Sequence, residues 1–422
     1  MAERPTRVRW RIYALLLLVV TLTFIDRFNM NVAAKYVQQE FGLTDLEIGS
    51  LLSAFALGYA LFQAPGGWLG DRLGPRRVLT GAILWWSGFT ALTALAVPAG
   101  GWFWGVRFLI GMGEAPALPC TNKMIGRWMA VRERARGSSL FLVAVGIGGA
   151  FTPPAIAWAM TTWGWRTSFV ACGALGLLVA ALWQWQSSEA PDAHPGVNTA
   201  ELALIQADRE AVAPAGPFPW RRLWGSVSIP ALIVANFLLG YVTYIFYTWF
   251  FLYLVNVRKL PVMAGSYWST VPFLAILVGA PLGGWVSDRL VRQLGQPWGR
   301  RVPVFCAALI SCGLLAVGSR MENPYAAIGL LALAAGCNSV AAVSSWAVPN
   351  DLSTRYAGTL AGVLNTCTNL GGALSPILTP YLATRYGWVA ALDCAAGFML
   401  AVGLLWLLVH PERRIDAEAT SA

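Results

Sequence analysis

The sequence alternates apolar runs with short polar connections, and each run is long enough to cross a lipid bilayer as a helix. Only 12% of the residues are charged and 57% are hydrophobic, whereas about a quarter of a soluble chain is charged. This composition excludes a disordered chain, a nucleic-acid-binding domain and a secreted module held by disulfides. We expect an all-α membrane protein with twelve transmembrane helices, near residues 12-35, 47-69, 78-97, 102-127, 137-160, 166-187, 227-255, 265-287, 302-319, 324-348, 357-384 and 388-409.

The net charge of +10 is concentrated outside these runs. Most of the Lys and Arg residues lie in the two tails and in the even-numbered connections, counted from the amino terminus. Because cytoplasmic loops carry an excess of basic residues, this asymmetry predicts that both termini are cytoplasmic. The charge is therefore a sign of membrane topology, and we expect a multi-pass protein of a bacterial inner membrane.

Two patterns occur twice along the chain. The run GWLGDR at residues 67-72, near the end of the second apolar run, has a counterpart in GWVSDR at residues 284-289, near the end of the eighth. The tripeptide GGA, with proline three residues later, begins at both residue 148 and residue 371. This duplication predicts two pseudo-symmetric six-helix bundles.

The expected bundles comprise residues 1-187 and 227-422. The proline-rich residues 188-226 between them are predicted to be a cytoplasmic linker, with a short helix at 199-212. Many secondary transporters have this doubled architecture, with the substrate site between the two halves.

The segment GWLGDRLGPRR at residues 67-77 resembles the cytoplasmic loop signature of the major facilitator superfamily, and it is partly repeated at 284-301. Glycine permits close helix approach, and the arginines favour a cytoplasmic position for the loop. The resemblance implies a gating role for five residues, namely Gly67, Asp71, Arg72, Asp288 and Arg289. A basic cytoplasmic loop with no gating role is the alternative.

Within that superfamily, the chain resembles the anion:cation symporter family, which includes bacterial galactonate, hexuronate and glucarate permeases. The resemblance rests on FIDR at residues 24-27 and RFLIGMGEAP at 107-116, and less specifically on RERA at 132-135 and on residues 358-376. It implies the major facilitator fold and transport of a sugar acid or another carboxylate. It also implies that Asp26 and Glu114 are protonatable and that Arg27 and Arg107 lie near the substrate.

These four charged residues are also conspicuous because they lie within apolar runs. Each costs roughly 2.5 to 3.5 kcal/mol at mid-membrane on insertion scales, so we expect them to face one another or an aqueous cavity. Arg107 and Glu114 share one helix face, and Gly111 between them leaves room for a ligand or a partner side chain. Arginine suits carboxylate binding, and a carboxyl of adjustable pKa suits proton transfer. A purely structural set of ion pairs is the alternative.

Tyr59, Tyr241, Tyr244 and Asn365 are further candidates for substrate contacts, although packing accounts for each equally well. Family resemblance places Tyr59 at the substrate, and the hydroxyls of Tyr241 and Tyr244 share a helix face. In sugar-acid permeases the fifth helix carries a polar side chain, often Gln, but the corresponding residues 142-146 are apolar here. A less hydroxylated or aromatic carboxylate is therefore a competing substrate.

The sequence contains no motif of a hydrolase, a nucleotide-binding loop or a metal site, and its seven cysteines show no C-x-x-C spacing. We expect a transporter that is not an enzyme and needs no cofactor or metal. The predicted activity is proton-coupled uptake of a small organic anion by alternating access, in a protein that works as a monomer. Uptake of an aromatic or short-chain carboxylate and drug or metabolite efflux by proton antiport remain alternatives.

Overall fold

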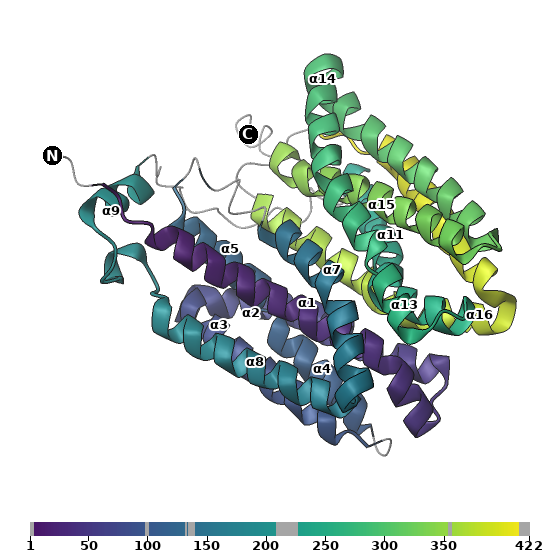
Figure 1. Cartoon of the computed structure of the whole chain (residues 1–422). Coiled ribbons are helices and arrows are strands. Elements are labelled where there is room, and N and C mark those ends of the chain that lie inside the picture. The colour runs from purple at the N-terminus through teal and green to yellow at the C-terminus, as the bar shows by residue number, and fades with distance from the viewer. Residues whose placement is uncertain are drawn as a thin grey trace. The chain divides into compact units, whose positions relative to one another are not determined.

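The computed structural model describes residues 4–97, 101–130, 133, 140–207, 227–352 and 357–412. Helices and connecting turns make up this part of the chain, and it contains no strand. The main helices (Figure 1) are α1 (Val8–Phe41), α2 (Asp45–Leu73), α3 (Pro75–Leu92), α4 (Trp102–Glu114), α5 (Ala117–Trp128), α7 (Leu140–Trp163), α8 (Trp165–Gln186), α9 (Thr199–Gln206), α11 (Ser228–Tyr244), α12 (Phe250–Leu252), α13 (Val262–Trp268), α14 (Val271–Arg320), α15 (Pro324–Leu352) and α16 (Ala357–Leu407).

Nine helical stretches of the described chain are long and apolar enough to cross a membrane. Two of these stretches contain a glycine in the left-handed region that breaks the helix, Gly295 with φ 79° in α14 and Gly387 with φ 86° in α16. The short helices α4 and α5 follow each other closely and together supply another crossing. With each kinked stretch divided in two, the described helices form the expected twelve crossings, so the predicted fold class is confirmed.

The predicted loop at residues 288–301 is mostly helical, because only Gly295 interrupts α14 there. The predicted linker is described as far as residue 207, and its helix α9 ends at Gln206. Residues 208–212 of the expected linker helix lie outside the described part of the chain. The family-like residues Arg132, Arg134 and Ala135 lie outside it as well.

The chain divides into two compact units. Unit 1 comprises Met1–Tyr36 and Ala54–Ala213, and unit 2 comprises Val37–Ser53 and Pro214–Ala422. In unit 1, α3 packs against α4, α5 and α8. In unit 2, α14 packs against α15 and α16, and α11 packs against α16.

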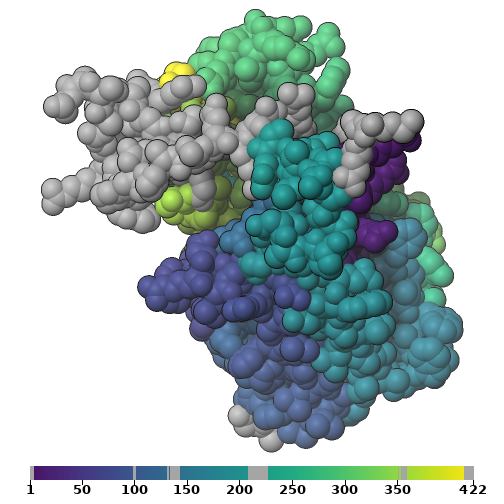
Figure 2. Space-filling view, turned by 90° about the vertical axis from the view of Figure 1, so that its left-hand side faces the viewer, coloured from purple at the N-terminus to yellow at the C-terminus, as the bar shows by residue number. Residues whose placement is uncertain are grey.

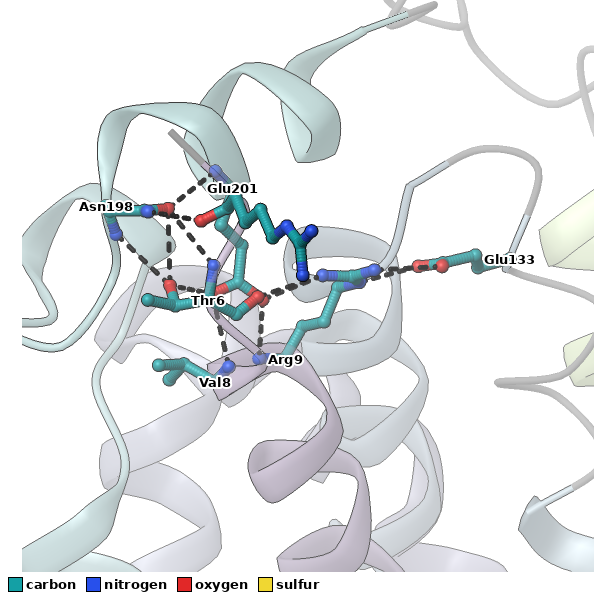
Figure 3. A network of polar contacts seen from close by, with 7 residues as sticks. Thr6, Val8, Arg9, Glu133, Asn198 and Glu201 are labelled. Atoms are coloured by element: carbon teal, nitrogen blue, oxygen red, sulfur yellow. Dashed lines mark hydrogen bonds and ion pairs between the residues drawn. The ribbon is translucent and has the colours of Figure 1, made fainter. Parts of the chain in front are cut away.

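A network of polar contacts joins the first residues of α1 to the helix α9 within unit 1 (Figure 3). The carboxylate of Glu201 is fully buried, and it accepts hydrogen bonds from the backbone N–H groups of Val8 at 3.1 Å and Arg9 at 3.2 Å. It also accepts from Arg9 Nη1 at 2.9 Å and from the Thr6 hydroxyl. Because the first N–H groups of a helix lack intrahelical partners, Glu201 acts as an anionic cap for α1.

Arg9 lies between two carboxylates in this network. Its Nε and Nη2 donate to the carboxylate of Glu133 at 2.8 and 3.1 Å, on the side of the guanidinium away from Glu201. In Figure 2 the teal segment that contains α9 lies beside the purple N-terminal residues, in agreement with these contacts. The segment after α8 is therefore tied to the start of α1 by specific hydrogen bonds.

Glu201→Gln is expected to lower the stability of unit 1. Burial alone would raise the pKa of Glu201, but hydrogen bonds from Thr6, Arg9 and the backbone outweigh it and hold the pKa below its ordinary value. A lowered pKa stabilises the folded state above the unfolded-state pKa, and this stabilisation is lost as pH falls through the folded-state pKa. We expect the free energy of unfolding to fall by about 2 kcal/mol at neutral pH. The decrease should be smaller near about pH 4, where the carboxyl of the wild-type protein begins to be protonated.

Thermal unfolding of the purified protein at both pH values measures this difference. Glu133→Gln is the control, because the Glu133 side chain is 20% exposed and that of Glu201 is 0% exposed. An equal effect of the two substitutions at neutral pH would contradict the assignment of Glu201 as the buried cap.

Candidate functional site

Unit 1 brings the four predicted charged residues into one buried cluster. Asp26 and Arg27 lie on α1, and Arg107 and Glu114 lie on α4. Asp26 is 3% exposed, Arg107 is 3% exposed and Glu114 is 0% exposed. Arg27 Nε donates a hydrogen bond to Glu114 Oε2 at 3.1 Å, which pairs the two helices. Burial of four charges in one place requires that they compensate one another or bind further charged groups.

An aromatic face supports both arginines. The Arg27 guanidinium carbon lies 4.5 Å from the ring centroid of Tyr59 and 5.1 Å from that of Phe55. The Arg107 guanidinium carbon lies 5.0 Å from the same Phe55 ring. Aromatic faces attract cations, so these rings stabilise the positions of both guanidiniums inside the protein. Tyr59 therefore belongs to the cluster, and its phenol is buried.

Several polar atoms of the cluster have no hydrogen-bond partner among the residues that the structure describes. They are Asp26 Oδ1, Arg107 Nε and Glu114 Oε1, and all three are buried. An unpaired buried polar atom costs about 1 to 3 kcal/mol, and more when its group is charged. Such atoms are rare in native proteins. Three of them in one cluster are typical of a site that binds protons or a ligand, because these would form hydrogen bonds with the unpaired atoms.

Gly111 lies between Arg107 and Glu114 along α4, but the space beside it holds the backbone of α2. A Cβ atom on Gly111 would collide with the carbonyl oxygen of Phe55, and one on Gly58 would collide with that of Phe108. The glycines therefore permit close contact of α2 and α4. The expectation of room for a ligand or a partner side chain at Gly111 was wrong, because α2 backbone occupies that space.

Gly111→Ala is expected to separate α2 from α4 and to destabilise the protein by about 2 kcal/mol, the typical cost of overpacking. The matched control is Gly105→Ala, also on α4, because nothing lies within 4 Å of a Cβ at Gly105. Thermal unfolding and transport assays on both variants measure the difference. Equal stability of the two variants would contradict the close contact.

The predicted residues of unit 2 are bonded to neighbouring helices. The Tyr241 hydroxyl lies 3.0 Å from Thr379 Oγ1, and its ring packs edge-on against Phe398 at 4.9 Å. The Tyr244 hydroxyl donates to Asn369 Oδ1 at 3.0 Å. These partners lie on α16, so both tyrosines join α11 to α16.

Asn365 lies one turn before Asn369 on α16. Its backbone carbonyl accepts a hydrogen bond from Asn369 Nδ2 at 2.9 Å.

The π-helical turn Ile245–Trp249 directly follows α11, and such turns are frequent at functional sites. The substrate roles of Tyr241, Tyr244 and Asn365 stay predictions.

The repeated loop motif forms a different ion pair in each unit. In unit 1, Lys123 Nζ on α5 pairs with Asp71 Oδ1 at 2.6 Å and also donates to the carbonyl oxygen of Gly67. Arg72 lies over the ring of Trp68 at 4.3 Å. The sequence alone does not predict this role of Lys123 in anchoring the motif, because Asp71 and Lys123 are far apart along the chain.

In unit 2, Arg300 bridges two carboxylates, with Nη1 at 3.2 Å from Asp288 and Nε at 2.9 Å from Asp351. Arg289 lies over the ring of Trp285 at 5.4 Å, as Arg72 does over Trp68. Each copy of the motif thus places an aspartate in an ion pair and an arginine on a tryptophan. The duplication inferred from the sequence is visible in these side-chain contacts.

Other predicted features have simple positions. In unit 2, Asp393 on α16 accepts hydrogen bonds from Arg320 Nη1 and Nη2 at 2.6 and 2.7 Å. In the described part of the chain, no group of three or more His, Cys, Asp or Glu side chains is placed to hold a metal ion.

A family model described as the Major Facilitator Superfamily matches residues 16–376 and 266–422. The D-galactonate transporter of Escherichia coli O6:H1 is 32% identical over 97% of both chains. A probable galactarate/D-glucarate transporter of Bacillus subtilis is 30% identical over 98% of this chain and 94% of its own. A probable sulfoacetate transporter of Cupriavidus necator is 31% identical over 98% of this chain and 97% of its own.

The fold is similar to that of a bacterial homologue of the human lysosomal transporter Spinster, solved in an inward-facing, unoccupied conformation. The TM-score is 0.77 at 19% identity, over 96% of this chain and 97% of that one. The family and these relatives are transporters rather than enzymes, and the relatives match the sugar-acid permeases that the sequence motifs resemble. The chain belongs to the Major Facilitator Superfamily.

Proposed function

We propose that this protein is a secondary active transporter that takes up a small organic anion together with protons by alternating access. The observation that carries the proposal is the buried cluster in unit 1, in which Asp26, Arg107 and Glu114 each have a buried polar atom with no hydrogen-bond partner among the described residues. Three such atoms in one charged cluster favour a binding role over a purely structural set of ion pairs, because an unmade buried bond lowers stability.

The two arginines are the proposed anion-binding groups. Guanidinium is always charged and offers a planar set of donors that matches a carboxylate. Arg107 Nε is buried and makes no hydrogen bond to the residues that the structure describes, and the Phe55 ring contacts the guanidinium without using its donors. The similar proteins named above are a D-galactonate transporter, a probable galactarate/D-glucarate transporter and a probable sulfoacetate transporter, and these substrates are all anions.

The two carboxyls are the proposed proton carriers. Glu114 is paired with Arg27, so protonation of Glu114 removes the negative partner and frees Arg27 for the substrate anion. Asp26 has an unpaired oxygen in the same cluster and takes the second proposed proton. When the site opens to the cytoplasm, loss of the protons restores the Arg27–Glu114 pair and displaces the anion.

The basic tails support a cytoplasmic location for both termini in a bacterial inner membrane.

The substrate class is a carboxylate with few hydroxyl groups, or a sugar acid bound with limited selectivity. On α7, residues 143–146 carry no polar side chain, and Ala144 and Val145 are buried. A site without hydroxyl-binding donors there discriminates weakly in favour of a polyol chain. We propose that one copy of the chain transports the substrate by itself. Efflux of cationic drugs is disfavoured, because the two buried arginines repel cations.

A thermal-shift screen of the purified protein tests the proposed substrate class. A ligand that binds only the folded state raises the unfolding temperature by mass action. We expect stabilisation by D-galactonate, sulfoacetate or benzoate, and none by the uncharged sugar galactose or by a cationic drug such as ethidium. Stabilisation by the cation alone would overturn the assignment of an anion transporter.

A further inference from the structure

Helix α14 carries a continuous exposed stripe along one face. Val278 is 67% exposed, Leu282 is 52% exposed and Trp285 is 55% exposed. Arg289 and Arg292 follow at the same alternating spacing of four and three residues, and both are exposed. Residues at this spacing share one helix face, so the five side chains form a single surface, which we call the α14 stripe. The stripe is apolar as far as Trp285 and cationic at its two arginines.

The packing of α14 fixes the direction of this stripe. A Cβ atom on Gly279 would collide with the carbonyl oxygen of Gly336, and one on Gly283 would collide with the Cα atom of Val340. These glycines therefore hold their side of α14 close against α15. At about 100° per residue, the α14 stripe lies roughly on the opposite side of the helix. The described helices of unit 2 leave the stripe uncovered, and its apolar part is suited to contact with lipid chains.

The two arginines of the α14 stripe pair with no carboxylate among the residues that the structure describes. The carboxylate of Asp288, beside Arg289 in sequence, is paired with Arg300, which also binds Asp351. Arg289 and Arg292 are neighbours on the helix surface, and like charges at such spacings destabilise a helix. The cationic end of the stripe therefore favours an anion that reaches both guanidiniums.

The copy of this pattern in unit 1 lacks the second arginine. Trp68 is 53% exposed, and Arg72 lies over its ring at 4.3 Å. Helix α2 ends at Leu73, one residue after this arginine. Helix α14 instead continues regularly as far as Gly295, and Arg292 lies on the added turn. The pair of cations is therefore a property of α14 and does not follow from the repeated motif.

We propose that the α14 stripe binds an anionic phospholipid. The phosphate lies between Arg289 and Arg292, and an acyl chain lies along Val278 and Leu282. Guanidinium matches phosphate with a planar set of donors, and basic residues next to a membrane span attract anionic lipids. Tryptophan is enriched where hydrocarbon meets the head groups, which is the position of Trp285 between the apolar and cationic parts. A free phosphate would use the arginines alone, whereas a lipid uses the whole stripe.

Native mass spectrometry of the purified, delipidated protein tests the inference by measuring the affinity for phosphatidylglycerol. We expect Arg292→Gln to weaken binding about fivefold, and the double variant Arg289→Gln/Arg292→Gln to weaken it about 25-fold. Phosphatidylcholine, which has the same chains and no net charge, should bind at least about fivefold more weakly than phosphatidylglycerol. Glycerol phosphate, which has no chains, should not compete with the lipid.

Arg385→Gln is the matched control. Arg385 is also an exposed arginine of unit 2 that lies over an aromatic ring, that of Tyr381 at 5.4 Å, but no second arginine follows it on the next turn. We expect this variant to bind phosphatidylglycerol with the wild-type affinity. Wild-type affinity in the double variant, or equal affinity of the wild type for the two lipids, would overturn the inference. Competition by glycerol phosphate would replace the lipid site with a site for free phosphate.

Discussion

Arg107→Ala is expected to lose carboxylate binding by about 100-fold or more, equivalent to roughly 3 kcal/mol. Arg107 is 3% exposed, and its Nε makes no hydrogen bond to the described residues, so we expect this donor to bind the substrate carboxylate of the proposed function. Removal of one partner from a buried charge pair leaves the other charge uncompensated, which is the most costly kind of polar substitution. Isothermal titration with the ligand found in the thermal-shift screen measures the loss directly.

Two further variants separate binding from folding in this experiment. Arg107→Lys keeps the charge but lacks the planar fork, so it should bind more weakly than the wild type and more strongly than Arg107→Ala. Arg320→Ala removes an arginine that pairs with Asp393 in unit 2 and should bind the ligand normally. Wild-type affinity in a folded Arg107→Ala protein would remove Arg107 from the substrate site.

Glu114→Gln is expected to abolish accumulation driven by a proton gradient while preserving exchange of substrate across the membrane. Glutamine has nearly the shape of glutamate, and its carbonyl oxygen still accepts from Arg27, so the site remains assembled. It cannot gain or lose a proton, so binding and release of substrate are no longer linked to proton movement. Accumulation should fall to the equilibrium level, at least about tenfold below the wild type under a gradient of about one pH unit.

Counterflow in proteoliposomes measures the exchange, and uptake under an imposed gradient measures the accumulation. Glu133→Gln is the control, because Glu133 is a unit 1 carboxylate that pairs with Arg9 outside the cluster. Gradient-driven accumulation in Glu114→Gln at the wild-type level would place proton coupling at another residue.

The four charged residues were predictable from the sequence because charge within an apolar run is costly and therefore rare. Their partners were not predictable. Arg27 and Glu114 lie 87 residues apart, and their pairing depends on how α1 and α4 pack. Gly111 illustrates the same limit, since helix periodicity places it on the correct face but does not reveal that the α2 backbone occupies the space.

Phe55, Lys123 and Glu201 were missed for different physical reasons. Phe55 looks like any apolar residue of a span, although its spacing of four from Tyr59 places both on one face of α2. Lys123 near a helix end is typical of a side chain that extends to water, and only the fold brings Asp71 to it. Glu201 lies in a polar linker, where burial of a carboxylate is not expected.

The twelve crossings were predictable because bilayer thickness determines the length of an apolar helix. The connections between the crossings were less predictable. The polar residues 288–301 continue helix α14 beyond the apolar run, and the helix is interrupted there only at Gly295. In unit 2, helix periodicity placed Tyr241 and Tyr244 on one face. It did not indicate that both hydroxyls bond to side chains of α16.

Simultaneous recording of substrate and proton movement tests the central claim most directly. Proteoliposomes with a pH-sensitive dye in the lumen receive external substrate, such as radiolabelled D-galactonate, with no initial pH gradient. The account predicts that the lumen becomes more acidic as the anion enters, and that both signals are absent in Arg107→Ala. Anion entry with no change of lumenal pH, or with a rise in lumenal pH, would contradict proton-coupled uptake.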